Sequence, residues 1–230
     1  HVIPLSAGKT RILTAVQNEL LFSDDEGVSF ITSGFTYPGE WSGNTLLSVV
    51  VLNDAGQSIY VLATVKDPST NMAAKWLYRS TDKGTSFQKI QDFNGDATLS
   101  MYNPHNSNEL FILETANTAN AFGLYEVKGA TVNKIATTTI SNGPAAGWLA
   151  GTKVGGVTVL YFFGETNETV YRSADLGKTW TVQGMFPEGW WCRPEVSAQN
   201  PDGLFYGGIN AYRSVDGGET WAMINPWSAY

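Results

Sequence analysis

A short pattern occurs four times in this 230-residue chain and constrains its fold more than any other feature. The pattern is Ser-x-Asp-x-Gly-x-Ser/Thr-aromatic, in segments 22–30, 79–87, 172–180 and 213–221. Self-similarity of this kind is typical of repeat architectures. Its defining residues are Ser23, Asp25, Gly27, Ser80, Asp82, Gly84, Ser173, Asp175, Gly177, Ser214, Asp216 and Gly218.

The spacing of the pattern predicts a fifth unit. Its serines, at positions 23, 80, 173 and 214, lie 57, 93 and 41 residues apart, and the middle interval is about twice 46. Residues 124–135 fall in that interval and resemble residues 77–90 with the Ser-x-Asp core deleted. Five units of roughly 46 residues therefore fill the chain.

Each unit predicts four short antiparallel strands. In the repeated turn the Asp carboxylate can accept backbone N–H groups and Gly can supply a positive φ, while an Asn-Pro or Asn-Asp turn precedes it as a second hairpin. Helical periodicity is absent from the sequence. We predict an all-β fold, a single β-propeller domain over residues 1–230 with about five four-stranded blades, or part of a larger propeller. The expected blades are residues 1–34, 45–92, 97–136, 147–184 and 193–225.

Composition excludes several classes of protein. Hydrophobic content of 43% with 15% charged residues argues against disorder, and no apolar run approaches the roughly 18 residues of a membrane span. A net charge of −7 argues against nucleic acid as a partner. The single cysteine, Cys192, excludes a disulfide framework, and a metal site would depend on His105. We expect no metal and no cofactor.

The repeated turn resembles the Asp-box, or BNR repeat, of sialidases, two-propeller xyloglucan hydrolases, sortilin-type receptor domains and a photosystem assembly factor. The resemblance covers essentially the whole chain, and the last unit, residues 211–221, is most similar to the hydrolase and sortilin-like branch. In that family the boxes lie between the third and fourth strands of a blade and are structural. The resemblance therefore implies a folding role for Asp25, Asp82, Asp175 and Asp216.

Strand alternation places both hairpin turns of each unit on one face and the longer connections on the other, where function usually resides. Two of these connections contain tryptophan beside charged residues. Indole faces can stack on sugar rings while charged groups bind hydroxyls, although the same tryptophans can instead cover blade edges. The predicted ligand-binding residues are Trp41, Trp190, Trp191 and Arg193.

Catalytic chemistry finds less support. Sialidase chemistry needs three arginines for the substrate carboxylate; three of the five arginines precede the repeated serines, which leaves only Arg11 and Arg193. Glycoside hydrolysis needs two facing acids, for which Glu40 and Glu188 are weak candidates that match no family motif position. We therefore predict a non-catalytic recognition or structural module that binds glycan or protein, extracellular or on a virion or cell surface. The alternatives are a glycoside hydrolase, or a fragment of one, that acts on a polysaccharide, and an assembly or sorting factor with a protein partner.

Overall fold

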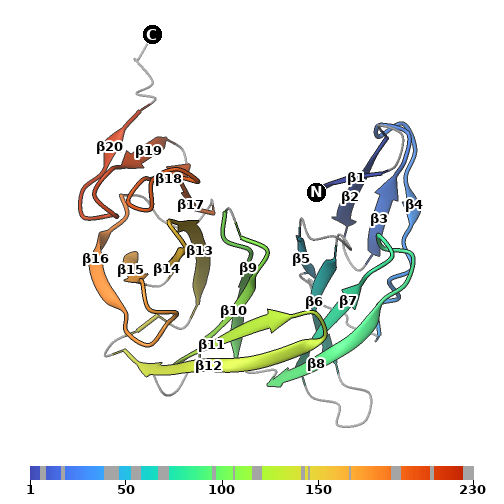
Figure 1. Ribbon diagram of the computed structural model, residues 1–230, viewed down its shortest axis with the longest axis horizontal. Helices are drawn as coiled ribbons and strands as arrows, with labels where there is room; N and C mark the ends of the chain where they lie inside the picture. Colours follow the sequence, from blue (N-terminus) through green and yellow to red (C-terminus); the bar gives the residue numbers. More distant parts are fainter. Residues whose placement is uncertain are drawn as a thin grey trace. The chain divides into compact units, whose positions relative to one another are not determined.

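The computed structural model describes most of the chain, and within the described residues every regular element is a β-strand (Figure 1). No helix there is long and apolar enough to cross a membrane. Side chains are described for all of these residues except Lys66 and Asn94. The described residues are 1–5, 9–16, 19–38, 47–52, 58–66, 73–94, 97–105, 107–115, 121–140, 143–144, 146–165, 167–187, 193–207 and 210–224.

The chain divides into two compact units. The first unit comprises residues 1–96 with 128–132, and the second comprises 97–127 with 133–230. The first unit contains two antiparallel four-stranded sheets, each with its strands in chain order. These strands are β1 (Val2–Pro4), β2 (Thr10–Val16), β3 (Glu19–Ser23), β4 (Ile31–Thr32), β5 (Leu47–Val51), β6 (Ile59–Lys66), β7 (Ala73–Ser80) and β8 (Gln88–Asn94).

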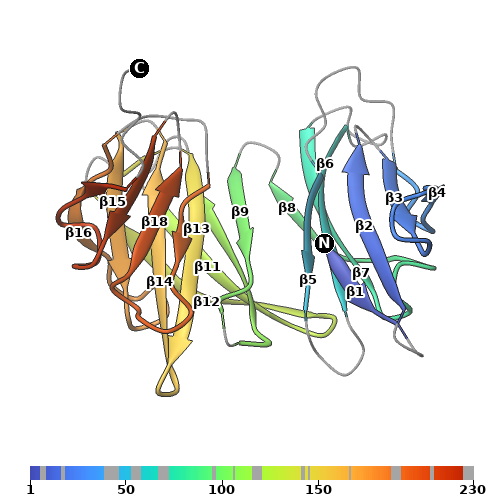
Figure 2. The ribbon, with the colours of Figure 1, turned by 90° about the horizontal axis from the view of Figure 1, so that it is seen from above.

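The second unit contains three more antiparallel four-stranded sheets, apart from residues 128–132 of the β11–β12 hairpin, which are counted with the first unit. The strands β13–β16 lie side by side (Figure 2). Its first sheet runs in the order β12-β11-β10-β9, the other two in chain order. The strands are β9 (Thr98–Tyr102), β10 (Leu110–Thr115), β11 (Ala121–Lys128), β12 (Thr131–Thr139), β13 (Gly147–Val154), β14 (Val157–Gly164), β15 (Thr169–Ser173), β16 (Thr181–Met185), β17 (Glu195–Val196), β18 (Leu204–Gly207), β19 (Ala211–Ser214) and β20 (Ala222–Met223).

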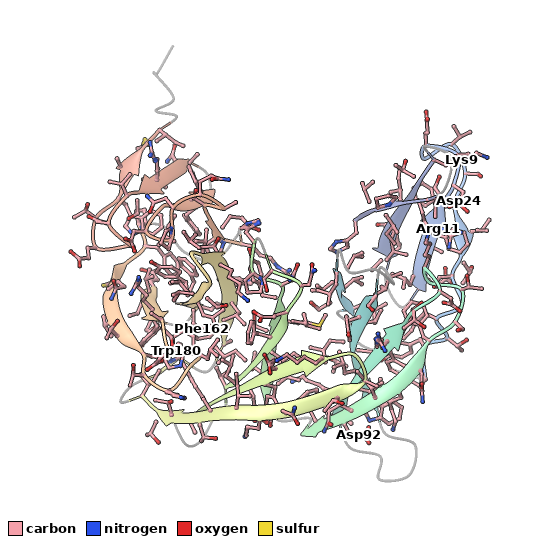
Figure 3. The ribbon with its side chains drawn as sticks, in the orientation of Figure 1. Lys9, Arg11, Asp24, Asp92, Phe162 and Trp180 are labelled. Carbon is pink, nitrogen blue, oxygen red and sulfur yellow. The ribbon has the colours of Figure 1, made fainter. Side chains whose placement is uncertain are left out.

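Alternating apolar residues of neighbouring sheets form the core within each unit. In the first unit, Ile3 and Leu13 of one sheet pack with Val61 of the next. In the second unit, the Phe122 ring stands edge-on to Phe162 at 5.0 Å and edge-on to Trp180 at 6.0 Å. Phe162 and Trp180 are labelled in Figure 3. Each such aromatic pair contributes about 0.5–1.5 kcal/mol beyond its buried area.

Five four-stranded antiparallel sheets built from consecutive strands make this an all-β fold of five propeller blades, which confirms the predicted fold class. The sequence repeat that lacks the Ser-x-Asp core forms the sheet β9–β12. There β11 and β12 are joined by a two-residue turn, in which Gly129 has a φ of 61°.

We call residues 23–29, 80–86, 173–179 and 214–220 the acidic turns. In the first, Ser23 Oγ donates to Asp25 Oδ1 at 2.7 Å and accepts the Gly27 amide at 2.8 Å, while the Ser29 amide donates to Asp25 Oδ1 at 2.9 Å. The other three acidic turns repeat these bonds. The glycine φ values lie between 76° and 97°, a region that glycine enters without steric cost.

Candidate functional site

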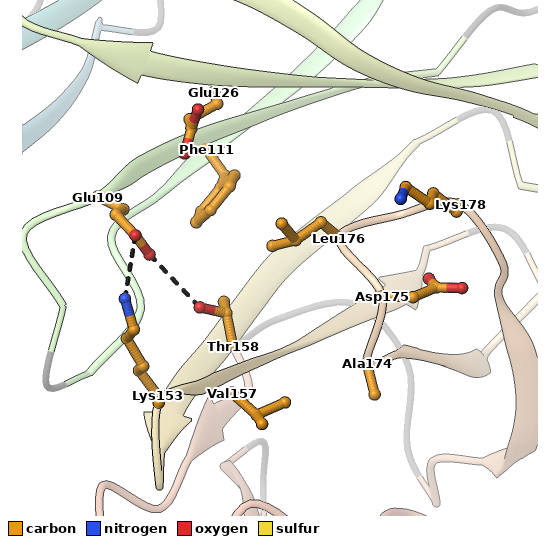
Figure 4. A pocket seen from close by; sticks show the side chains of 11 residues that line it. Glu109, Phe111, Glu126, Lys153, Val157, Thr158, Ala174, Asp175, Leu176 and Lys178 are labelled. Carbon is orange, nitrogen blue, oxygen red and sulfur yellow. Dashed lines mark hydrogen bonds and ion pairs between the residues drawn. The ribbon is translucent and has the colours of Figure 1, made fainter.

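A pocket of about 360 Å³ opens in the second unit between the sheets β9–β12 and β13–β16 (Figure 4). Four segments build its wall: the beginning of β10, the part of β11 that carries Glu126, the β13–β14 hairpin, and the acidic turn that follows β15. The lining residues are Glu109, Phe111, Glu126, Lys153, Gly156, Val157, Thr158, Ala174, Asp175, Leu176 and Lys178.

The pocket therefore lies on the side of the hairpin turns. The sequence predicts function on the opposite side, in the longer connections. On the turn side, two hairpin types come together: the Gly217 amide of the last acidic turn donates to the carbonyl of Asp202, in the first hairpin of the same sheet. Because the strands of a sheet alternate in direction, its first and third connections lie at the same end of the sheet.

Glu109 is the centre of a hydrogen-bonded network on one wall. Lys153 Nζ lies 3.0 Å from Glu109 Oε1, and Ser107 Oγ and Thr158 Oγ1 donate to Glu109 Oε2 at 3.1 and 3.4 Å (Figure 4). Burial raises the pKa of the Glu109 carboxyl, but the bonds from Lys153 and Ser107 outweigh it and bring the pKa below its ordinary value. Glu109 is therefore ionised at neutral pH.

The segment that carries Glu109 is itself held in place. Asn103 Nδ2 donates to the carbonyl oxygens of Ser107 and Glu109 at 2.8 and 2.7 Å, so one side chain closes the loop between β9 and β10. Such local side-chain bonds are how Asn fixes a turn. The Glu109 carboxylate is thus positioned before any ligand arrives.

The acidic turn forms the opposite wall. Burial raises the pKa of Asp175, but hydrogen bonds from the Thr179 amide and hydroxyl and from Ser173 lower it below the ordinary value. Thr138 Oγ1 of β12 donates to the carbonyls of Gly177 and Lys178 at 2.7 and 3.1 Å, which fastens this turn to the neighbouring sheet. Lys178 itself is exposed at the rim.

Apolar side chains complete the lining. Phe111 is fully buried, whereas Leu176 and Val157 remain 37% and 51% exposed. Ligand pockets typically combine apolar walls with a few placed polar groups, at volumes of roughly 300–1,000 Å³. A polyhydroxylated ring fits this lining, because its C–H groups can contact the apolar residues while its hydroxyls bind carboxylates and ammonium groups.

The same electrostatics argue against hydrolysis in this pocket by Glu109 and Asp175. Glycosidases need one carboxylic acid whose pKa is raised, so that it can protonate the leaving group. Both of these carboxyls have lowered pKa values. They are suited to accept hydrogen bonds from a ligand rather than to donate a proton to it.

Most of the residues predicted from sequence to contact a ligand fall outside the described residues. These are Trp41, Trp190 and Trp191, together with Glu40, Glu188 and Cys192. Arg193 is described and is exposed. Sequence reasoning missed Glu109 and Lys153, which lie 44 residues apart and belong to no common motif.

Solved structures share this fold. A Hadza microbial sialidase (Hz136) is 16% identical with a TM-score of 0.57 over 96% of this chain. A fucose-specific lectin from Aleuria aurantia is 13% identical with a TM-score of 0.55 over 96%. The GH74 xyloglucanase from Xanthomonas campestris is 14% identical with a TM-score of 0.58 over 98%.

The chain spans 56% of the sialidase, 76% of the lectin and 38% of the xyloglucanase. No protein-family model matches the chain, and no curated protein sequence matches it. At these identities the similarity establishes the β-propeller fold alone.

Proposed function

We propose that this chain is a non-catalytic propeller module that recognises carbohydrate, and that the pocket beside Glu109 holds a sugar residue. The observation that carries the proposal is the pairing of an ionised polar wall, Glu109 with Lys153, with an apolar wall that includes Leu176. Lectins and carbohydrate-active enzymes among the structural neighbours are in keeping with this function.

Preorganisation supports binding by this pocket. Glu109 is held by Lys153 and by the segment that Asn103 fixes, and Asp175 is held by the hydrogen bonds of its turn. The free-energy cost of ordering these side chains on ligand binding is therefore small. Sugar hydroxyls would accept from Lys153 and Lys178 and donate to the carboxylates. We further propose that the acidic turns are Asp-boxes, whose carboxylates serve the fold.

A glycan array, run together with a polysaccharide-hydrolysis assay on the same sample, tests the proposal. We expect binding without release of reducing sugar. Binding should be at least about tenfold weaker in Glu109→Gln and in Lys153→Met, because each substitution removes one charged hydrogen bond to the ligand. The matched controls are Glu219→Gln and Lys9→Met, exposed residues outside the pocket lining. Binding that is unchanged in both pocket variants would contradict a sugar site in this pocket.

The tryptophan-bearing connections remain a second proposed contact. Trp41, Trp190, Trp191 and Arg193 would supply stacking faces and a guanidinium for a longer glycan. Binding that disappears in Trp41→Ala or Trp190→Ala, but persists in Glu109→Gln, would move the recognition site to that side of the blades.

A glycoside hydrolase is the second candidate function, because Glu40 directly precedes Trp41 and Glu188 lies two residues before Trp190. It predicts release of reducing sugar that Glu40→Gln or Glu188→Gln abolishes.

A protein partner, as for an assembly or sorting factor, would give pull-down of that partner without any glycan signal. Location outside the cell or on a particle surface stays a prediction.

A further inference from the structure

The last sheet of the second unit, β17–β20, exposes an aromatic residue at a position that is buried in the sheet before it. Phe205 of β18 lies opposite Arg213 of β19 and is 41% exposed. Tyr161 of β14 lies opposite Arg172 of β15 and is fully buried. The two positions correspond, because each arginine directly precedes the serine of an acidic turn. Phe205 and Arg213, which we call the Phe205 face, therefore occupy positions that a further sheet would cover.

Sheet β17–β20 itself covers Tyr161. Tyr161 packs in one hydrophobic core with Leu204 of that sheet, which is also fully buried. Arg172 Nη2 lies 3.4 Å from Asp202 Oδ1, so the arginine of one sheet pairs with an acid on a hairpin of the next. A sheet that covers the Phe205 face therefore has to supply an apolar strand surface and an acceptor oxygen on a turn.

Sheet β1–β4 of the first unit presents such a strand surface. In β17–β20, Val196 and Leu204 lie beside the serine of the acidic turn, and both apolar residues are buried. The same register in β1–β4 places Val2 and Ile12 beside Ser23. Val2 is 65% exposed, and Ile12 is only half-buried. The side of β1–β4 that corresponds to the packed side of β17–β20 is therefore uncovered.

The aromatic residue after the first acidic turn belongs to the same surface. Trp180, which directly follows the third acidic turn, packs against Phe122 of the sheet before it, with 6.0 Å between ring centres. Phe30 occupies the same position after the first acidic turn and is 43% exposed. We call the surface formed by four residues of this sheet and its turn the Ile12 face: Val2, Ile12, Glu26 and Phe30.

Charge complementarity supports a pairing of the two faces. Lys83 and Glu26 occupy the same position in their acidic turns, with φ values of 60° and 62°. The Lys83 carbonyl accepts a hydrogen bond from Arg11 Nη1 of the preceding sheet at 2.7 Å. At the same position the Ile12 face carries the exposed carboxylate of Glu26, which is a partner of opposite charge for the exposed Arg213.

We propose that the Phe205 face binds the Ile12 face of a second copy of this chain. Phe205 then packs on the second copy's Ile12 and Phe30, and Arg213 pairs with the second copy's Glu26. Every chain carries both faces, so the contact joins two different surfaces, as in a head-to-tail assembly. The sheet β17–β20 measures about 19 Å across its strands and about 13 Å along them. A contact of this size is at the small end of specific interfaces, so we expect association in the micromolar range.

Sedimentation velocity over a series of protein concentrations tests the contact. We expect the mean mass of the wild type to rise with concentration. Phe205→Asp should raise the dissociation constant at least about tenfold, because it places an unpaired charge in a desolvated contact. Val182→Asp is the matched control, a 63% exposed valine on β16 that belongs to neither face, and it should associate as the wild type does.

The charged pair gives a second test that does not depend on the folding of one variant. Arg213→Glu and Glu26→Arg should each raise the dissociation constant about fivefold, because each brings like charges together. The chain that carries both substitutions should associate within about twofold of the wild type, since the pair is restored with its signs exchanged.

A mixing experiment distinguishes contact between unlike faces from contact between like faces. Phe205→Asp and Phe30→Asp chains should each stay monomeric alone, and a mixture of the two should form pairs, because one intact Phe205 face meets one intact Ile12 face. The proposal is overturned if the wild type keeps the mass of one chain at every concentration, as it would if another occupant covers the face. It is also overturned if Phe205→Asp associates like the wild type, or if the mixture stays monomeric.

Discussion

Ser214 donates its hydroxyl hydrogen to Asp216 Oδ1 at 2.7 Å, and its oxygen accepts the amide of Gly218 at 2.9 Å. Ser214 is 1% exposed, so no solvent can replace either bond. Asp216 in turn accepts the Thr220 amide at 3.0 Å. One buried hydroxyl therefore connects the carboxylate and the glycine of the turn, and the same connection recurs at Ser23, Ser80 and Ser173.

Replacing Ser214 by Ala should lower the free energy of unfolding by about 1–3 kcal/mol, because the Gly218 amide is left buried without its acceptor. Urea denaturation monitored by tryptophan fluorescence measures the change. Val215→Ala is the matched control in the same turn; its side chain is 59% exposed, and we expect a change within about 0.5 kcal/mol. Equal effects of the two substitutions would contradict a folding role for the hydroxyl.

Acid should weaken the fold through the acidic turns. Hydrogen bonds from Ser29 and from Thr220 lower the pKa values of Asp25 and Asp216 from 3.8 to about 2. Because the folded-state pKa lies below the unfolded one, the stabilisation is fully present above pH 4 or so and is lost as the pH falls through about 2.

The urea midpoint should therefore decline between about pH 4 and pH 2. The decline should be shallower in Asp216→Asn, which removes one titrating carboxyl. A midpoint whose pH dependence is the same in the variant as in the wild type would show that Asp216 makes no such contribution.

At Gly34 the neighbouring backbone leaves no room for a side chain. A Cβ on Gly34 would lie 1.7 Å from the carbonyl oxygen of Thr85, and the Gly34 amide donates to the carbonyl of Gly84 at 2.9 Å. Gly34→Ala should cost more than about 3 kcal/mol of stability, because backbone must move.

Gly207→Ala is the matched control for Gly34→Ala. Nothing lies within 4 Å of its added Cβ, and its φ is outside the positive region, so the substitution should be neutral or mildly stabilising. Thermal unfolding of the two variants distinguishes them, and a Gly34→Ala protein that melts with the wild type would contradict the close approach to Thr85.

The electrostatics of the pocket give a further prediction. Lys153→Met removes the ammonium group that lies 3.0 Å from Glu109, and burial then raises the Glu109 pKa without that opposing bond. NMR titration of the Glu109 carboxyl should show a higher pKa in the variant. An unchanged pKa would mean that Lys153 does not hold this carboxylate in its ionised form.

The fold was predictable because its information is local. The acidic turns repeat at a regular interval, and the doubled gap between Ser80 and Ser173 indicated a further blade, which the structure shows as β9–β12. The hydrogen bonds of those turns join residues two to four positions apart, so the residue types at a fixed spacing are enough to predict them.

The pocket was not predictable, because it depends on contacts between sheets. Glu109 and Lys153 lie 44 residues apart in the sequence and meet only because β10 and β13 belong to neighbouring sheets. The tryptophan connections attracted attention because aromatic and charged residues adjoin in the sequence. Side chains brought together by sheet packing leave no such local pattern.

Calorimetric titration of the wild type, Glu109→Gln and Glu219→Gln with the glycan selected by the array measures whether the pocket beside Glu109 binds sugar. We expect saturable binding to the wild type and to Glu219→Gln, binding at least about tenfold weaker to Glu109→Gln, and no release of reducing sugar during the titration. Equal affinity in all three proteins, or turnover of the glycan, would contradict a non-catalytic sugar site in this pocket.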